Sequence, residues 1–513
     1  MNRGLIISKA ARYFRDKTAI VDGNKRFTYN EANERVNRLA NGLLGLGVNK
    51  RSRVAGLSHN CHQHIELIFA LAKIGAAVVS INPRFKPDEL AWQVNDSNAD
   101  TIIVEGAAAE MVTSMRSDLK FTKNIICHDE VSGTISYEQL IKDSSADEVW
   151  PDTNDDDLAS IIYTSGTTGL PKGIMLSNKS QISVFRNLLL DAVPDLNEVD
   201  VYMALQPLYT AGGVFILPCW ARGVKQVIVP RYDAELAYKM VEKERVTFIK
   251  TVPTVLQRFV ENPDRCKYDL SSLRTVVYGG SPMPREKLRE ALDVLGPIFI
   301  QNYGQSEAPM TCLVLNKKDH TDERKLEAAG RPYTMVECKI VDDNGHEVPV
   351  GEAGELIIRA DHIMQGYWNR PPELTRETLK DGWIYTRDIA KEDEGGYIYL
   401  VDRKSDMIVS GGYNVYPNEV EQIIYEHHAV HEAAVVGVPD EKWGEAVKGI
   451  VVLKEGVLAT EEDLIAFCKK RLAGYKVPKS IDFKDDLPKN ETGKIMRRSL
   501  KDFYWKGRGR RIN

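Results

Sequence analysis

The segment YTSGTTGLPKG, residues 163–173, combines glycines with hydroxyl side chains, as loops that wrap a phosphate do. It follows the apolar run LASIIY, which predicts a strand, and Ser177 beyond it can cap a helix. A Walker A loop is excluded because Lys172 is preceded by Pro171 and followed by Gly173. The glycines allow backbone N–H groups to turn toward an anion, and Lys172 adds a positive charge, so the segment still predicts anion binding. A flexible turn without a ligand is the alternative.

Three side chains of NYGQSE, residues 302–307, suit three parts of a metal-bound nucleotide. Tyr303 offers a ring face to a purine, Ser306 a hydroxyl to a phosphate, and Glu307 a hard oxygen ligand to Mg²⁺. The alternatives are core packing at a strand end for Tyr303 and a solvated carboxylate for Glu307. The segment therefore predicts a nucleotide site with a metal ligand.

Other polar positions are ambiguous when taken one at a time. Asp388 in YTRD can accept two ribose hydroxyls, or it forms a structural pair with Arg403. Lys494 in NETGKI would by itself be a surface lysine. Gly411 and Gly412 in SGGYN would by themselves form a tight hairpin turn.

The elements around these residues alternate between strands and helices. The strands SRVAGLS and AAVVSINP flank the helix HIELIFALAKIG, and a helix precedes them at residues 32–44. In the middle of the chain, VTFIK, RTVVYGG and IFIQNYG are predicted strands separated by the helices PTVLQRFV and PREKLREALDVLG. This order is typical of parallel sheets, which bind ligands at their strand ends.

The second half of the chain changes character twice. After about Gly351 the pattern becomes antiparallel β, and from Ser405 a compact α+β unit follows, with a boundary near VDRKSD. The predicted fold class is therefore α/β. We expect a large N-terminal domain of α/β layers plus a β-rich subdomain, residues 1–402, and a small C-terminal domain, residues 403–513.

Length and composition fit an ordinary multidomain enzyme of 513 residues, with 43% hydrophobic and 27% charged residues. The net charge of −5 argues against a nucleic-acid partner. Seven scattered cysteines predict no disulfide framework. With neither a signal peptide nor an apolar run of about 18 residues, we expect a cytoplasmic protein without an integral membrane segment.

Five motifs together resemble the adenylate-forming superfamily, which comprises acyl- and aryl-CoA synthetases, firefly-type luciferases and peptide-synthetase adenylation domains. They are YTSGTTGLPKG, NYGQSE, YTRD, DRKSDMIVSGGYNVYPNEVE and PKNETGKI, in the order of that family and across nearly the whole chain. The resemblance implies an adenylation domain, followed by a mobile C-terminal domain that carries a catalytic lysine. It is closest to fatty-acid or aryl-acid CoA ligases.

The resemblance also implies site residues. Lys494, Glu307 and Thr164 are implied to be catalytic, with Lys494 at the oxygen between carboxylate and α-phosphate and Glu307 on the metal. Lys172 is expected to steady the outgoing β- and γ-phosphates. The implied ATP- and AMP-binding residues are Thr164, Ser165, Gly166, Thr167, Thr168, Gly169, Lys172, Gly279, Gly280, Ser281, Asn302, Tyr303, Gly304, Ser306, Asp388, Arg403 and Lys494.

Two further sets follow from the same resemblance. The implied acyl pocket contains Tyr209, Thr210, Val214 and Gly280. The implied tunnel for coenzyme A contains Gly411, Gly412 and Tyr413, reached after the small domain rotates about a hinge at Ser405.

The sequence departs from the usual pattern of the family at several positions. Ser405 stands where Asp or Lys is common, Arg387 where glycine is usual, and Ser306 where Thr is common. Thr210 replaces a histidine that borders the acyl pocket in similar enzymes, so we expect a differently shaped or gated pocket. Because LYTAGG has no Asp to pair with an α-amine, an aliphatic or aromatic acid is expected rather than a free amino acid.

The predicted function is an AMP-forming carboxylate–CoA ligase that uses ATP, Mg²⁺ and coenzyme A. Its partners would be a small carboxylic acid and CoA, with a homodimer as a possibility. The alternatives are a ligase that loads a carrier protein, a luciferase-like oxidoreductase and a non-catalytic nucleotide-binding protein. CoA-dependent AMP release distinguishes the CoA ligase from the ligase that loads a carrier protein. Oxygen uptake would indicate the oxidoreductase, and pyrophosphate release with an acid would exclude the non-catalytic protein.

Overall fold

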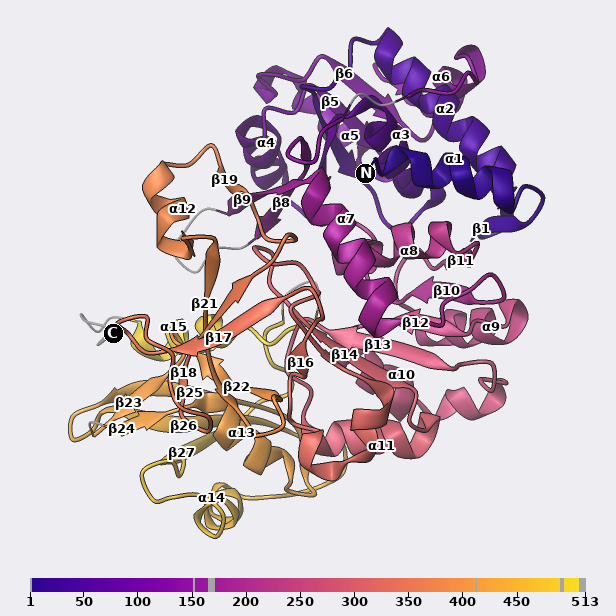
Figure 1. Cartoon of the computed structure of the whole chain (residues 1–513). Helices are drawn as coiled ribbons and strands as arrows, with labels where there is room; N and C mark the ends of the chain where they lie inside the picture. The colour runs from indigo at the N-terminus through magenta and orange to yellow at the C-terminus, as the bar shows by residue number, and fades with distance from the viewer. Residues whose placement is uncertain (1, 151–152, 165–170, 412, 490–492, 507–513) are drawn as a thin grey trace.

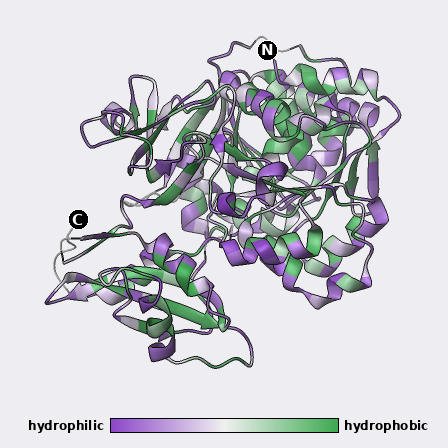
Figure 2. Ribbon diagram, turned by 60° about the horizontal axis from the view of Figure 1, so that its bottom comes forward, coloured by the Kyte–Doolittle hydropathy of each residue, from purple (hydrophilic) through white to green (hydrophobic). Residues whose placement is uncertain are grey.

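The computed structural model describes residues 2–150, 153–164, 171–411, 413–489 and 493–506. Within these residues the chain forms two large sheets, an antiparallel sheet and a smaller C-terminal unit (Figure 1). Apolar residues concentrate in the strands and on the inner faces of the helices (Figure 2).

The first large sheet is parallel at its centre and antiparallel toward both edges. Parallel pairing brings the carboxyl ends of its central strands to one edge. In spatial order its strands are β16 (Arg331–Pro332), β15 (Leu313–Leu315), β14 (Phe299–Tyr303), β13 (Thr275–Gly279), β12 (Phe248–Lys250), β10 (Val201–Ala204), β11 (Lys225–Ile228), β1 (Thr18–Asp22) and β2 (Lys25–Thr28).

The second large sheet also has a parallel centre, and an antiparallel pair, β8 and β9, lies toward one edge. Strand β9 was not predicted from the sequence, although the predicted cap at Ser177 is confirmed. In spatial order its strands are β19 (Gly366–Trp368), β9 (Lys172–Ser177), β8 (Leu158–Thr164), β4 (Ala77–Ile81), β3 (Arg53–Leu57), β5 (Thr101–Val104), β6 (Asn124–Cys127) and β7 (Ile135–Ser136).

Helices fill the space between the two sheets and cover their outer faces. The main core lies between the sheets and includes α1 (Gly4–Tyr13), α2 (Tyr29–Gly45), α3 (His62–Ile74), α6 (Tyr137–Asp143), α7 (Asn178–Asn187) and α8 (Ile216–Ala221). Separate clusters hold the outer helices, which are α4 (Pro87–Asp96), α5 (Gly106–Ser114), α9 (Ala234–Glu244), α10 (Pro253–Glu261) and α11 (Arg285–Leu295).

An antiparallel sheet follows, as the sequence predicted. Its strands are β17 (Glu337–Val341), β18 (Gly354–Arg359), β20 (Leu379–Lys380), β21 (Trp383–Glu392) and β22 (Ile398–Arg403), and α12 (Pro372–Thr378) precedes β20.

The C-terminal unit has a core of its own, formed where helices pack on one more sheet. Its elements are β23 (Ile408–Ser410), β24 (Tyr413–Val415), α13 (Pro417–Tyr425), β25 (Val430–Asp440), β26 (Gly444–Leu453), α14 (Glu461–Lys469), β27 (Ser480–Phe483) and α15 (Arg497–Trp505). The predicted α/β class, with one large and one small part, agrees with this architecture.

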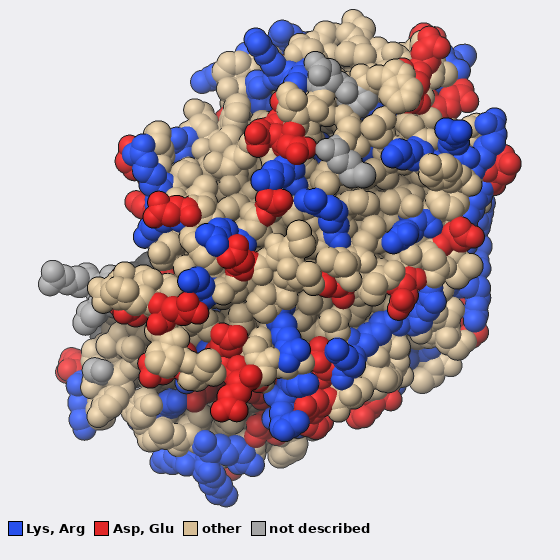
Figure 3. Space-filling view, in the orientation of Figure 1, with Lys and Arg blue, Asp and Glu red and all other residues tan. Residues whose placement is uncertain are grey.

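Charged side chains of both signs are interspersed over most of the face in Figure 3. None of the helices among the described residues is both long and apolar enough to cross a membrane.

Candidate active site

The carboxyl ends of β13 and β14 form the floor of the candidate site. These parallel strands end side by side, with Gly279 opposite Asn302. The Asn302 side chain is 2% exposed, and its Oδ1 accepts a hydrogen bond of 2.9 Å from the Tyr333 hydroxyl. Its Nδ2 has no hydrogen-bond partner among the described residues. A buried donor without a partner is costly, so this amide is suited to contact a bound ligand.

Asp388 on β21 reaches the same strand edge. Its Oδ2 accepts hydrogen bonds from the Tyr303 hydroxyl at 2.6 Å and from Gln305 Nε2 at 2.8 Å. The Nε of Arg403 lies 3.4 Å from Oδ1. Burial and the charge of Asp388 raise the pKa of Tyr303, so its hydroxyl remains a donor. The structure therefore brings these predicted residues together, and it adds Gln305, which the sequence did not single out.

Tyr303 packs against the core, as the structural alternative predicted, and its contact with a purine stays a prediction. Its ring is half-buried and packs against the main core, while its hydroxyl contacts Asp388. Gly304, Ser306 and Ser281 are also half-buried, near the ends of β14 and β13.

Arg387 adopts a backbone conformation that explains why glycine is usual there. Its φ is +61°, in the left-handed region that costs most residues about 1 kcal/mol or more and costs glycine little. The Arg387 N–H donates to Glu355, and its carbonyl accepts from the Lys404 N–H at 2.9 Å. Arginine thus occupies a backbone conformation that favours glycine.

Glu307 is linked to Lys172 through an aromatic ring from a different strand. The hydroxyl of Tyr367, on β19, donates to Glu307 Oε1 at 2.9 Å. Lys172 Nζ lies 5.2 Å from the centroid of the same ring. Strands β19 and β9 pair, which holds Tyr367 beside this end of the phosphate loop. Tyr367 was missed because GYW has only the pattern of a short strand.

A magnesium ion carried by a phosphate group fits these residues. Among the described residues there is no group of three potential His, Cys, Asp or Glu ligands. Mg²⁺ is usually held by one or two carboxylates together with substrate phosphates, and Glu307 supplies one carboxylate.

The predicted phosphate loop joins β8 to β9. Thr164 and Lys172 face each other across this antiparallel pair, so both flank the loop. The predicted loop residues Ser165, Gly166, Thr167, Thr168 and Gly169 lie outside the described residues.

Lys494 lies close enough to Asp388 and Arg403 for their charges to act on it. Burial, and then the positive charge of Arg403, lower the pKa of Lys494 to about 8, whereas the charge of Asp388 acts in the opposite direction. The preceding Gly493 has φ +81°, and a Cβ there would clash with Thr254 at the start of α10. The close approach of this loop to the large domain therefore depends on glycine.

An ion pair crosses the predicted domain boundary near Ser405. Arg497 Nη1 lies 3.0 Å from Asp402 Oδ1 and 3.6 Å from Asp406 Oδ2. Burial raises the pKa of Asp402 to about 6. Ser405 itself is exposed, and its hydroxyl lies 3.1 Å from Asp406 Oδ1. The hinge role of Ser405 and the boundary at residue 402 stay predictions.

Three of the four predicted acyl-pocket residues lie on the segment 205–215 after β10, which we call the acyl-pocket loop. The Tyr209 hydroxyl donates to Asn82 Oδ1 at 3.2 Å, and Thr210 Oγ1 donates to the Pro207 carbonyl at 2.8 Å. Val214 is half-buried in a short 3₁₀ helix, Ala211–Phe215. The fourth residue, Gly280, directly follows β13.

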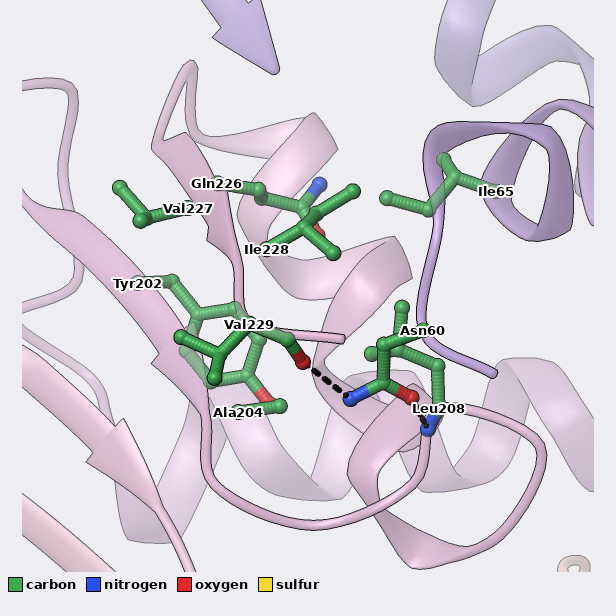
Figure 4. A pocket seen from close by; sticks show the side chains of 9 residues that line it. All are labelled: Asn60, Ile65, Tyr202, Ala204, Leu208, Gln226, Val227, Ile228 and Val229. Carbon is green, nitrogen blue, oxygen red and sulfur yellow. Dashed lines mark hydrogen bonds between the residues drawn. The ribbon is translucent and has the colours of Figure 1, made fainter. Parts of the chain in front are cut away.

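Asn60 fixes the start of this loop (Figure 4). Its Nδ2 donates to the carbonyls of Gln206 at 3.2 Å and Val229 at 3.0 Å, and its Oδ1 accepts from the Leu208 N–H at 2.7 Å. The cavity beside it has a volume of about 10 Å³, which is room for one water molecule and none for a substrate.

Two of the predicted CoA residues, Gly411 and Tyr413, lie at the paired strands β23 and β24 on the outer edge of the C-terminal unit (Figure 1). Gly411 has φ +59°, and its N–H donates to the Trp443 carbonyl at 2.8 Å. Tyr413 is 60% exposed and stacks on Tyr475 with 4.9 Å between the ring centroids. Gly412 lies outside the described residues. Gly411 thus has the left-handed conformation that favours glycine, and the role of these residues with CoA stays a prediction.

Comparison with known proteins assigns the family. Residues 7–368 match the AMP-binding enzyme family, and residues 419–494 match the AMP-binding enzyme C-terminal domain. The chain belongs to this family, so the resemblance to adenylate-forming enzymes is confirmed.

Individual relatives are similar over nearly their whole length. A feruloyl-CoA synthase of Amycolatopsis sp is 37% identical over 95% of this chain and 96% of its own. A fatty acid–[acyl-carrier-protein] ligase of Streptomyces coeruleorubidus is 34% identical over 96% and 95%. The crystal structure of an anthranilate CoA ligase in complex with anthranoyl-AMP has a TM-score of 0.91 at 28% identity, over 98% and 97%. The feruloyl-CoA synthase and the anthranilate CoA ligase agree with the predicted class, an AMP-forming acid–CoA ligase. The acyl-carrier-protein ligase agrees with the predicted alternative, a ligase that loads a carrier protein.

Proposed function

We propose that this protein activates an aliphatic or aromatic carboxylic acid with MgATP and then transfers the acyl group to coenzyme A. In the first step a carboxylate oxygen attacks the α-phosphorus, the bond to the β-phosphate oxygen breaks, and pyrophosphate leaves. In the second step the CoA thiolate attacks the acyl carbon, the bond to the AMP oxygen breaks, and AMP leaves.

The observation that carries this proposal is the convergence of Lys494, Asp388 and Arg403 at the carboxyl edge of the large sheet. Asp388 would bind the ribose hydroxyls, and Lys494 would stabilise the charge that develops on the oxygen joining acid and α-phosphate. A Lys494 pKa near 8 keeps much of this amine protonated at neutral pH.

The remaining roles extend from this cluster. Asn302 Nδ2 and the Tyr303 ring would contact adenine, and Lys172 would hold the β- and γ-phosphates. Glu307 would bind Mg²⁺, which when present neutralises phosphate charge. Because Lys494 stands near Asp388, the C-terminal unit must move before a thiol can enter. The contacts between Arg497 and the 402–406 segment would constrain that movement.

A panel of carboxylic acids tests the proposal, with and without CoA, followed by pyrophosphate and AMP release. Pyrophosphate release with an acid, together with AMP release that requires CoA, is the expected result. A carrier protein is the second candidate acceptor, because one relative is named as an acyl-carrier-protein ligase. AMP release with an acyl carrier protein and none with CoA would favour it, whereas no pyrophosphate release with any acid would contradict the proposal. The cytoplasmic location and the homodimer stay predictions.

A further inference from the structure

Lys250 is a fully buried lysine at the carboxyl end of β12. Its Nζ donates to the carbonyl of Thr251 at 2.9 Å, and no other hydrogen bond or ion pair of Lys250 is found among the described residues. Burial lowers the pKa of this amine to about 7. An ammonium has three donors, so the contacts of the chain use only part of its capacity.

The Lys250 side chain projects from the sheet face that the acyl-pocket loop covers. Residues two apart on a strand share a face, so Lys250 lies on the same side as Phe248. The Phe248 ring packs edge-on against Phe215 with 4.8 Å between the centroids. Opposite Phe248 on β10, the Tyr202 hydroxyl donates to the Gly212 carbonyl at 2.9 Å. Both contacts are made to the turn that contains Val214.

The residues directly after Lys250 contact other parts of the candidate site. A Cβ on Gly280 would lie 3.9 Å from Val252, and the loop of Lys494 touches Thr254 through Gly493. Lys250 thus stands at one end of a segment that borders both Gly280 and Lys494.

The loop after β10 also reaches this segment through Gln206. With its amide nitrogen turned toward Thr251, Gln206 donates to the Thr251 carbonyl at 3.1 Å and accepts from the Gly212 N–H at 2.7 Å. The carbonyl that Lys250 contacts is therefore shared with the acyl-pocket loop.

A buried amine with one carbonyl partner is unfavourable unless something else pairs with it. An apolar acyl chain would leave it unpaired, whereas a negatively charged or strongly accepting oxygen would satisfy it. Sites built to bind a polar substrate group reject analogues that lack the group, often by several orders of magnitude.

We propose that Lys250 binds an oxygen atom at the end of the substrate acid far from the reacting carboxylate, either a phenolic oxygen or a second carboxylate. This inference rests on the proposed function and narrows its substrate class from any aliphatic or aromatic acid to an acid with such a distal oxygen. Thr210, which replaces the histidine that the family resemblance implies, lies on the same loop.

Matched pairs of acids test the inference in the wild-type enzyme through acid-dependent pyrophosphate release. One pair is 4-hydroxycinnamate and cinnamate, and the other is octanedioate and octanoate. We expect kcat/KM for the oxygen-bearing member of at least one pair to be more than tenfold higher, and the pair that responds identifies the kind of oxygen. Equal or lower values for the oxygen-bearing members of both pairs would overturn the inference, whatever the variants do.

Lys250→Met then links this preference to the side chain. The ratio of the two kcat/KM values in the preferred pair should fall at least tenfold, because methionine fills the space without donating a hydrogen bond. Lys287→Met is the matched control, since Lys287 is also buried but pairs with Glu261 and Glu290 on the helix side. Its ratio should equal that of the wild type.

The outcomes separate the two proposals. An equal loss for both acids of a pair in Lys250→Met, with an unchanged ratio, would make Lys250 a structural residue and overturn the inference while the proposed function stands. If Lys250→Met does not fold, the wild-type ratios decide. Absence of pyrophosphate release from wild type with any acid would instead overturn the proposed function.

Discussion

Two buried lysines in different regions of the molecule differ in how many polar groups of the protein contact their amines. Lys73, on α3 between the two large sheets, donates to Ser8 and Asn33 at 3.0 Å and to Asn37 at 2.5 Å, and it also pairs with Glu148. Lys250, at the ligand edge of the first sheet, has one backbone carbonyl. Burial lowers the pKa of both amines, but only Lys73 has a carboxylate that opposes this effect.

The difference indicates that Lys73 stabilises the fold, whereas Lys250 is suited to bind a ligand. Four side chains from three segments converge on Lys73, so its removal leaves their polar atoms without a partner. Removal of Lys250 leaves little unpaired in the protein. We therefore expect variants near Lys73 to lose stability, and variants in the cleft to lose catalysis or selectivity.

The largest effect should come from the cleft lysine closest to the reacting bond. Lys494→Ala should lower acid-dependent pyrophosphate release by at least about 1,000-fold, or about 4 kcal/mol in the barrier, since each factor of ten costs about 1.4 kcal/mol. Thioester formation from supplied acyl-adenylate and CoA should fall less than about tenfold. Single-turnover assays of each half-reaction measure both.

Thermal unfolding of Lys494→Ala provides the control, since a midpoint within about 2 °C of wild type would exclude a folding defect. Equal losses in the two half-reactions would contradict the assignment of Lys494 to adenylation. They would also weaken the contrast with Lys73, because the effect of Lys494 would then not be specific to one chemical step.

Lys73→Met should cost stability rather than selectivity. It leaves Glu148 and the side chains of Asn33 and Asn37 without their cation, and breaking such a buried pair costs about 3–5 kcal/mol. Chemical denaturation followed by fluorescence measures the loss. The double variant Lys73→Met, Glu148→Gln should recover part of it, because the unpaired charge is gone.

If Lys73→Met lost less stability than Lys250→Met, the contrast between the two lysines would be wrong. It would mean that the contacts around Lys73 contribute no more than the single carbonyl of Lys250.

The pH dependence of stability should differ between wild type and Lys250→Met. The pKa of Lys250 is lowered to about 7 in the folded protein, from an unfolded value near 10.5, so between these pH values the unfolded chain binds more protons. Stability contributed by this group therefore rises as pH increases from about 7 to 10. At about 1.4 kcal/mol for each pKa unit, the rise is at most a few kcal/mol.

Denaturation midpoints of wild type and Lys250→Met across this pH range measure the difference. The wild-type curve should rise relative to that of the variant, and parallel curves would show that Lys250 is already paired in the folded protein.

Much of the fold and of the nucleotide site was predictable from the sequence because both depend on local patterns. Apolar runs with period two or 3.6 predicted β12, β13, β14 and the helices between them. The motif residues Asp388, Arg403 and Lys494 were predicted as a group, and the structure brings them together.

Tyr367 and Lys250 could not be recognised because their surroundings form only in the folded chain. GYW and VTFIK have the pattern of ordinary strands, and nothing in them reveals a carboxylate from residue 307 or the lack of one near residue 250. The left-handed backbone at Arg387 had a signal in the sequence, because glycine is usual at that position in the family pattern.

The smallest effect should come from Tyr367→Phe, which tests whether the contrast extends beyond lysines. The change removes the hydrogen bonds of the hydroxyl with Glu307 and with Thr378 but keeps the ring beside Lys172. We expect adenylation to slow about tenfold and to need more Mg²⁺, because Glu307 loses the contact that orients it. Stability should change by about 2 kcal/mol or less, because each of the two hydrogen bonds usually contributes about 1 kcal/mol.

Mg²⁺ titrations of pyrophosphate release and thermal unfolding measure the two effects of Tyr367→Phe. Tyr399→Phe is the matched control, because that hydroxyl contacts Asp393 and the Arg324 carbonyl instead of a predicted site residue, and its Mg²⁺ dependence should equal that of wild type. If Tyr367→Phe lowered stability without changing the Mg²⁺ dependence, the hydroxyl would serve the fold as Lys73 does. The contrast would then fail, because a polar contact at the ligand edge of the sheet would stabilise the fold just as the contacts of Lys73 between the sheets do.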